Sequence, residues 1–267
     1  MNNPHELDKN SGNDGAMLRL DGVSKYFSGF TAVNDVSFDV PRGAIAGLIG
    51  PNGAGKTTLF NTLAGQLEND AGQVFLDEQP IHGQPPHSIF ANGLARTFQI
   101  PRPFPEMTVL ENIMTVPGNQ IGERFWNNWI RPGAVAREEI TIRQKSEEVL
   151  DFCNLTGVRG DLAGTLSGGQ LKLLELARAL MSDPKIILLD EPAAGVNPSL
   201  MVSLVDRIVE LNKRGFTFLI IEHNMELVMS LCDPVIVMAQ GSVIYNGNAE
   251  GARKDPAVLE AYLGDLP

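Results

Sequence analysis

The chain carries the octapeptide Gly50-Pro51-Asn52-Gly53-Ala54-Gly55-Lys56-Thr57, a full match to the phosphate-binding pattern G-x-x-x-x-G-K-S/T and here called the P-loop. An apolar run over 44–49 precedes it and predicts a strand buried on both faces, and a helix is expected from Lys56 to Leu63. The glycines let successive N–H groups point toward one centre, and the helix N-terminus adds partial positive charge. We expect Lys56 to neutralise β- and γ-phosphates and Thr57 to offer its hydroxyl to Mg²⁺. A glycine-rich turn with a chance lysine is the weaker alternative, because the strand and helix patterns are both in place.

A second pattern places two carboxylates at the end of a predicted buried strand. The apolar residues 186–189 are followed by Asp190 and Glu191. Asp190 is placed to hold Mg²⁺ directly or through water, and Glu191 to orient or deprotonate an attacking water. Alone, acids at a strand end would more often cap a helix. Together with the P-loop, the metal and base roles become the better interpretation.

The third pattern is Leu166-Ser167-Gly168-Gly169-Gln170. Ser167 and Gln170 form a capping box for a helix whose apolar residues recur at helical spacing. A plain cap would not need two consecutive glycines, which weaken a helix start. The glycines expose backbone N–H groups beside the serine hydroxyl and so predict a second anion site. An ordinary, well-capped helix is the alternative.

Composition and charge limit the partners. The chain has 267 residues, 43% of them hydrophobic, and 21 Lys and Arg against 32 Asp and Glu give a formal charge of −11. This balance argues against nucleic acid and anionic lipid as general partners. The two cysteines, Cys153 and Cys232, suit a reducing compartment and are expected to be inert. No run approaches the ~18 apolar residues that span a bilayer, and no secretory signal is visible.

The order of patterns predicts one α/β domain with a helical insertion. The polar residues 1–16 are expected to form a disordered tail, followed by a single domain over 17–267. Strand and helix patterns alternate over 17–103 and 183–267, the expected catalytic core, whereas 104–182 is mainly helical.

Local signals predict several boundaries. Thr108 with Glu111 marks a helix start, and Asn197 caps a helix whose first residue is Pro198. The pair Gln240-Gly241 predicts a hairpin turn between two short strands. The proline-rich residues 79–105 indicate a connector rather than a long element.

In this order the P-loop, Leu166–Gln170 and the Asp190-Glu191 pair resemble the motifs of ATP-binding cassette (ABC) proteins, over roughly Leu18 to Gly264. The resemblance implies the ABC ATPase fold, a P-loop NTPase core with an antiparallel β subdomain and a helical insertion, and it implies ATP and Mg²⁺ as cofactors. Leu166–Gln170 is similar to the family's signature motif. In that family two cassettes stack head to tail, and the signature of one closes on the ATP held by the P-loop of the other. The partner cassette is therefore expected to be an identical chain or a sister subunit.

The resemblance also implies roles for single residues. Phe27 is similar to the aromatic residue that stacks on adenine, with neighbouring Tyr26 left open. Gln99 resembles the glutamine that senses Mg²⁺ and water, and His223 resembles the histidine that contacts the γ-phosphate, so both join Glu191 as expected catalytic residues. The expected nucleotide-binding residues are Phe27, Gly50, Pro51, Asn52, Gly53, Ala54, Gly55, Lys56, Thr57, Thr58, Ser167, Gly168, Gly169 and Gln170. The expected Mg²⁺ ligands are Thr57, Gln99 and Asp190.

One position departs from the family pattern. Asn197 stands where the family usually has an aspartate, and it keeps a helix cap without the charge. The resemblance thus implies hydrolysis but not coupling between the two sites of a dimer. Four stretches, Phe30–Phe38, Glu191–Pro198, Ile221–Met225 and Val258–Gly264, resemble ATPase subunits of branched-chain amino acid importers, where this Asn is typical. The ATPases of urea and short-chain amide importers share these stretches.

An ATP-hydrolysing importer subunit, peripheral on the cytoplasmic face of the membrane, is therefore the implied function. It would act with separate transmembrane permease subunits and, indirectly, with a solute-binding protein. A non-transport ABC ATPase is one alternative, although such proteins usually have a second cassette, a coiled-coil insert or a basic surface. A small-molecule phosphotransferase is another, but it leaves Leu166–Gln170 without a role. Trp126 and Trp129 indicate either ordinary packing, which we favour, or a patch that docks on a membrane partner.

Overall fold

The strands of the protein form two sheets. The computed structural model describes residues 15–97, 101–118, 120–121, 126, 129 and 132–263. The antiparallel sheet has the order β2-β1-β4-β5 and comprises β1 (Ala16–Phe27), β2 (Phe30–Pro41), β4 (Ala71–Leu76) and β5 (Gln79–Pro80). The second sheet has the order β10-β9-β3-β8-β7-β6. Its strands are β3 (Ile45–Ile49), β6 (Leu94–Arg96), β7 (Ile186–Asp190), β8 (Thr217–Ile221), β9 (Val235–Ala239) and β10 (Ser242–Gly247).

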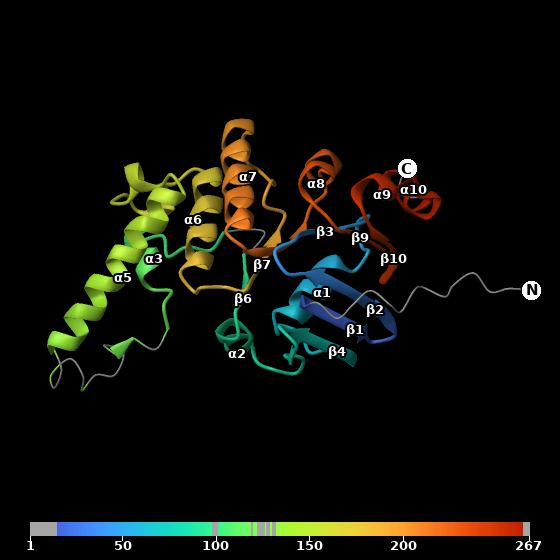
Figure 1. Cartoon of the computed structure of the whole chain (residues 1–267), viewed down its shortest axis with the longest axis horizontal. Coiled ribbons are helices and arrows are strands. Elements are labelled where there is room, and N and C mark those ends of the chain that lie inside the picture. The colour runs from blue at the N-terminus through green and yellow to red at the C-terminus, as the bar shows by residue number, and fades with distance from the viewer. Residues whose placement is uncertain are drawn as a thin grey trace, which may run out of the picture.

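Helices cover both faces of the second sheet (Figure 1). The helices are α1 (Lys56–Leu63), α2 (Pro86–Ala91), α3 (Val109–Met114), α5 (Pro132–Phe152), α6 (Gly168–Leu180), α7 (Pro198–Lys213), α8 (Met225–Leu231), α9 (Ala249–Lys254) and α10 (Pro256–Leu263). Every described element between β6 and β7 is helical, including the short 3-10 turns Thr156–Val158 and Ala163–Thr165. Within the described ranges we find no helix that combines the length and the apolar character needed to span a bilayer.

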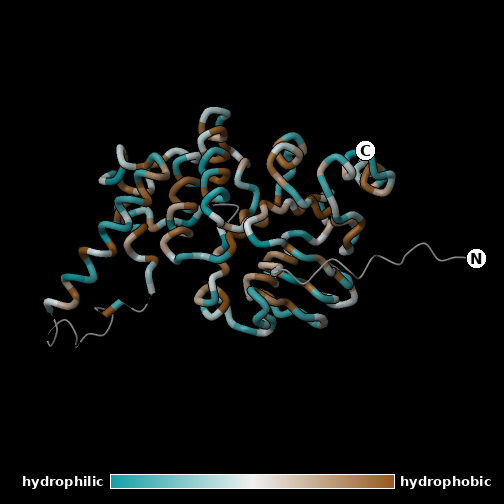
Figure 2. Tube along the Cα trace, viewed as in Figure 1, coloured by the Kyte–Doolittle hydropathy of each residue, from teal (hydrophilic) through white to brown (hydrophobic). Residues whose placement is uncertain are grey.

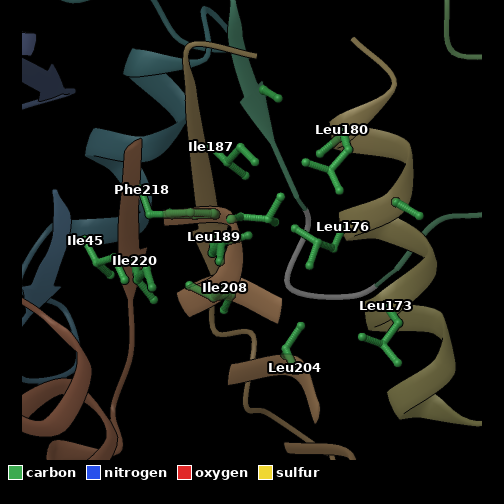
Figure 3. Packing of buried hydrophobic residues seen from close by; sticks show 14 of the residues in the cluster. Ile45, Leu173, Leu176, Leu180, Ile187, Leu189, Leu204, Ile208, Phe218 and Ile220 are labelled. Atoms are coloured by element: carbon green, nitrogen blue, oxygen red, sulfur yellow. The ribbon is translucent and has the colours of Figure 1, made fainter. Parts of the chain in front are cut away.

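The strand β7 shows why the central sheet is hydrophobic on both faces. Ile187 and Leu189 pack with residues of α6 and α7 (Figure 3). Ile186 and Leu188 point the other way and pack with α1 and the antiparallel sheet. Since neighbouring strand residues face opposite sides, an uninterrupted apolar run is what a strand between two cores requires. Hydrophobic positions accordingly gather where the central strands meet the helices (Figure 2).

Several local predictions are confirmed. The helix α1 has the predicted bounds, the Asn197 side chain accepts a hydrogen bond from Leu200 N at the start of α7, and Gln240-Gly241 turns between β9 and β10. The residues 79–105 contain no long element among those described, as expected, although the six-residue helix α2 lies within them. One boundary is wrong, because Ala16, expected in the tail, pairs with Pro41 as the first residue of β1.

The two tryptophans are not packed as we favoured. Trp126 and Trp129 have 72% and 79% of their surface exposed. The spacing of the two residues does not tell whether the rest of the protein covers them. The docking interpretation therefore stays as a prediction.

The parallel strands bring three turns to one edge of the central sheet. The neighbouring strands β3, β8 and β7 run in the same direction, so their carboxyl ends lie side by side. The P-loop follows β3, Glu191 follows β7, and His223 lies just after β8. In open parallel sheets this edge is where ligands bind.

Candidate functional site

The backbone of the P-loop is so close to its neighbours that two positions require glycine. At Gly50 a Cβ atom would lie 2.0 Å from the carbonyl oxygen of Met238, and at Gly55 it would lie 2.3 Å from that of Ala32. Both glycines have positive φ angles, 147° and 95°, which side-chain-bearing residues rarely adopt. Gly55 is also the N-cap of α1. The loop can therefore turn sharply and present its N–H groups at the start of the helix.

Lys56 is held beneath the loop. Its side chain is buried, and Nζ donates hydrogen bonds of 2.8 Å to the carbonyl oxygens of Gly50 and Pro51. The ammonium group is thus fixed at the centre of the loop. A phosphate held by the N–H groups would meet this charge directly.

The loop forms one wall of a cleft of about 330 Å³. The cleft is lined by Phe30, Ala32, Asn52, Gly53, Ala54, Gly55, Lys56, Thr57, Thr58, Glu191 and His223. The structure thus brings most of the predicted P-loop residues together with the predicted base and the predicted histidine. The aromatic residue in the lining is Phe30, which sequence reasoning missed. Phe27 and Tyr26 are partly exposed on the same hairpin, and the adenine-stacking role of either stays a prediction.

Glu191 and His223 form a pair across the cleft. The Nε2 atom of His223 lies 2.8 Å from Oε1 of Glu191. Glu191 has a left-handed backbone, with φ 47°, and its N–H donates to the carbonyl oxygen of Ile221 at 2.9 Å. A strained backbone at a non-glycine residue persists only where its surroundings fix it, and such residues cluster at functional sites. The carboxylate is therefore placed by β7 and β8 together.

The Glu222 side chain links the two turns that carry Glu191 and His223 through hydrogen bonds. It is buried, and its Oε1 accepts a hydrogen bond from Ala193 N at 2.8 Å. Its Oε2 accepts from His223 N at 3.0 Å and from Asn224 N at 3.3 Å. One carboxylate thus ties the turn after β7 to the turn after β8. The sequence pointed to the neighbouring His223 but not to Glu222. The contacts of Glu222 depend on β7 and β8 being neighbours in the sheet, which the sequence pattern does not show.

Asp190, the predicted Mg²⁺ ligand at the end of β7, is not among the residues that line the cleft. It is buried at the end of β7, where its Oδ2 accepts a hydrogen bond of 2.9 Å from Nη2 of Arg96. Thr57 is exposed in the P-loop and supplies a hydroxyl. These oxygen donors fit Mg²⁺, which usually takes one or two carboxylates and completes its shell with water and phosphate oxygens. No cluster of three or more His, Cys, Asp or Glu suited to a metal occurs among the described residues.

The third predicted Mg²⁺ ligand, Gln99, lies outside the described residues. The chain leading to it is fixed to β7, because Thr97 N donates to the carbonyl oxygen of Leu188 at 2.9 Å. The role of Gln99 stays a prediction.

The predicted signature lies at the start of α6, away from the lining of this cleft. Ser167 and Gln170 form the predicted capping box, in which Oε1 of Gln170 accepts from Ser167 N at 2.9 Å. Ser167 and Gly168 are exposed, whereas a Cβ atom on Gly169 would come within 2.4 Å of Leu200 on α7. One glycine is thus required by helix packing and the other faces outward, where its backbone can meet a ligand.

A buried lysine connects α6 to the catalytic turn. Nζ of Lys172 donates to the carbonyl oxygen of Glu191 at 3.4 Å. Burial lowers the pKa of this ammonium group, and four carboxylates oppose the shift, those of Glu175, Asp190, Glu191 and Glu222. Sequence reasoning missed Lys172, because a lysine on an amphipathic helix is usually solvated.

Comparisons with known proteins agree with this geometry. The family described as ABC transporter matches residues 33–194. The probable branched-chain amino acid transport ATP-binding protein LivG of Archaeoglobus fulgidus is 46% identical over 248 residues, which cover 93% of this chain and 95% of that protein. The high-affinity branched-chain amino acid transport ATP-binding protein BraF of Pseudomonas aeruginosa is 40% identical over 250 residues, covering 93% and 98%.

Solved structures give the same result. A nucleotide-free ATP-binding cassette from an ABC transporter has a TM-score of 0.80 and 38% identity, with 94% of this chain and 100% of that chain covered. An ATP-binding cassette of an ABC transporter in its ADP conformation has a TM-score of 0.78 and 38% identity, covering 94% and 99%. The predicted fold class is therefore confirmed. The family match covers more than half of the chain, and the P-loop, the Glu191–His223 pair and the capped helix α6 all lie within this fold. This chain therefore belongs to the ABC transporter family as an ATP-binding cassette.

Proposed function

We propose that this cassette hydrolyses ATP to ADP and phosphate and that the reaction drives solute uptake. The observation that carries the proposal is the Glu191 carboxylate, 2.8 Å from His223 and in the same cleft as the P-loop. A base and a phosphate cradle that share one cleft suit attack of water on a terminal phosphate.

The residues divide the reaction between them. The P-loop N–H groups and Lys56 hold the β- and γ-phosphates. Glu191 orients the water and takes its proton as the water oxygen bonds to the γ-phosphorus and the bond to the β–γ bridging oxygen breaks. His223 contacts the γ-phosphate and keeps Glu191 in place. Thr57, Asp190 and Gln99 would hold Mg²⁺, which when bound would supply positive charge to neutralise the phosphate oxygens.

A second cassette completes the site. In one chain the signature residues Ser167 and Gly168 are exposed and are not part of the P-loop cleft. Two chains that meet head to tail around a two-fold axis can each offer this surface to the other's nucleotide. The phosphate-binding residues predicted at the signature then act on ATP held by the partner, an identical or sister cassette.

The permease is proposed to dock between the core and the helical insertion. A groove of about 280 Å³ is lined by Ile89 and Phe90 of α2, Thr97, and Glu175 and Arg178 of α6, among others. One residue of its lining, Thr97, lies two residues before Gln99 in the sequence. A partner helix bound in this groove would therefore contact the segment that leads to Gln99, the residue proposed to sense Mg²⁺ and water. We propose that the cassette acts in this way on the cytoplasmic face of the membrane.

The proposed cargo is a branched-chain amino acid, bound by a separate solute-binding protein. The support is that the LivG and BraF relatives, which the chain matches over nearly its whole length, are named as branched-chain amino acid transport proteins. Urea or short-chain amides are the alternative cargo. A role outside transport is the more distant alternative.

The substitution Glu191→Gln tests the catalytic proposal. A carboxamide fills the same volume but cannot take a proton, and general-base help is worth about 10²–10⁴ in rate. We expect ATP binding to persist and hydrolysis to fall by that factor, with the closed dimer accumulating. Wild-type turnover in this variant would show that Glu191 is not the base. Stimulation of the wild-type ATPase by ribosomes or DNA, and not by permease subunits, would favour the non-transport alternative.

A further inference from the structure

The helix α6 connects the exposed signature residues to the turn that carries Glu191. Lys172 follows Gly168 by four residues, which is about one helical turn or ~6 Å along the axis. Its side chain is buried, and its Nζ donates to the carbonyl oxygen of Glu191 at 3.4 Å. The residue that contacts the catalytic turn therefore lies one turn away from the surface proposed to meet the partner's nucleotide.

Apolar packing fixes α6 against the strand that ends at this turn. Leu173, Leu176 and Leu180 of α6 belong to the same buried cluster as Ile187 and Leu189 of β7 (Figure 3). Close-packed side chains of this kind leave little room for one element to shift on the other. The position of the lysine ammonium group relative to the end of β7 is therefore well defined.

Glu191 is held by its backbone as well as by its side chain. Its N–H donates to the carbonyl oxygen of Ile221 at 2.9 Å, and its Oε1 lies 2.8 Å from Nε2 of His223. Its carbonyl oxygen accepts from Ala194 N at 3.1 Å and from Nζ of Lys172. Of these four contacts, Lys172 supplies the one that comes from the helical insertion. A left-handed backbone at a non-glycine residue depends on such contacts to persist.

The stability of the fold does not explain the charge of Lys172. Burial outweighs the attraction of Glu175, Asp190, Glu191 and Glu222 and lowers the pKa of the ammonium group, so folding disfavours its charged form. Replacing a buried charge by a well-packed apolar side chain of similar volume is often neutral for stability. The hydrogen bond to Glu191 therefore gives the better reason for a lysine at this place.

We propose that Lys172 is a positioning residue, which holds the main chain of Glu191 so that its carboxylate meets the attacking water. The signature helix then serves both sites of the dimer, because its first residues act on the partner's nucleotide and Lys172 acts on the base of its own chain. The inference deepens the proposed function and rests on it, since it assumes that Glu191 is the base in ATP hydrolysis.

The test compares Lys172→Met with Lys172→Arg. Methionine is unbranched and flexible but has no ammonium donor, whereas arginine keeps the charge and the donors. The matched control is Lys213→Met, the same change at an exposed position of α7. Steady-state ATP hydrolysis gives kcat and KM, equilibrium binding of a fluorescent ATP analogue gives Kd, and urea denaturation gives the unfolding midpoint.

For Lys172→Met we expect kcat to fall about tenfold, because a small displacement of a catalytic group can cost up to about 10²-fold in rate. We expect KM, Kd and the urea midpoint to stay at their wild-type values, since the P-loop is unchanged and the lost charge was not stabilised by folding. Lys172→Arg should keep kcat within about threefold of the wild type, because a charged donor remains. Lys213→Met should match the wild type in every measurement.

Two results would overturn the inference. One is a Lys172→Met protein with the wild-type kcat. The other is a Lys172→Arg protein that loses as much turnover as Lys172→Met, because the loss would then come from disturbed packing and not from the missing ammonium group. If Glu191→Gln kept wild-type turnover, Glu191 would not be the base and the proposed function itself would fail, so the two failures are distinguishable.

Discussion

Glu222 allows the sharpest test of how the catalytic turns are held. In Glu222→Gln the side chain keeps its length, but one carboxylate oxygen becomes an NH₂ group. Oε1 of Glu222 accepts from Ala193, and Oε2 accepts from His223 and Asn224. In either orientation of the amide, at least one backbone N–H faces another donor.

The expected loss follows from these contacts. The better orientation keeps the amide oxygen toward His223 and Asn224 and gives up the bond to Ala193. One hydrogen bond to a charged group, worth about 1.5–3 kcal/mol, is then lost, and the other two weaken because the acceptor is neutral. Since the site is buried, we expect the free energy of unfolding to fall by about 2–4 kcal/mol. Because the turns carry Glu191 and His223, kcat should also fall, by about 10- to 100-fold.

Urea denaturation followed by circular dichroism measures the first effect, and ATP turnover measures the second. The matched control is Glu139→Gln, the same change at an exposed position of α5, which should stay within about 0.5 kcal/mol of the wild type. If Glu222→Gln unfolded at the wild-type urea concentration and kept full turnover, the idea that this carboxylate joins the two turns would be wrong.

Three further predictions follow from how far single side chains are buried or exposed. Arg96→Ala leaves the Asp190 carboxylate buried and unpaired, so stability should fall by about 3–5 kcal/mol in chemical denaturation; a change below about 1 kcal/mol would contradict the burial argument. Burial raises the thiol pKa of Cys153 and of Cys232 to about 12, so a thiolate-specific reagent at pH 8 should react only after urea is added, and fast labelling of the folded chain would refute this. Trp129→Ala should change stability by less than about 0.5 kcal/mol, because 79% of the side chain is exposed, and a loss above about 2 kcal/mol would restore the packing interpretation.

Local patterns were the part of the fold that the sequence could predict. The bounds of α1 follow from a glycine loop next to a helical pattern, and the start of α7 follows from Asn197 with Pro198. The helices α8 and α9 carry the same type of signal, since Asn224 and Asn248 cap them through their side chains. Both helices are short, however, so little apolar periodicity accompanies the caps, and neither helix is among the predicted elements.

Contacts between distant strands account for what could not be predicted. Glu222 reaches Ala193 only because β7 and β8 are neighbours, and Arg96 meets Asp190 only because β6 pairs with β7. No spacing rule connects such pairs. Phe30 likewise enters the cleft through the turn that joins β1 and β2. Sequence motifs thus located the groups proposed to react, and the tertiary structure supplied the residues that hold them.

The separation of the exposed Ser167–Gly168 surface from the P-loop cleft has a kinetic consequence. In the proposed head-to-tail dimer, each chain needs the partner's signature at its own nucleotide, so it turns over only after the two chains meet. For free cassettes more dilute than the dissociation constant of the dimer, the rate per chain rises in proportion to concentration, and the total rate rises as its square. When a permease holds two cassettes together, as proposed, their effective concentration is high, and the total rate no longer rises as the square of the cassette concentration. Assembly alone can thus act as an on-switch, which spares the cell idle ATP consumption by unassembled subunits.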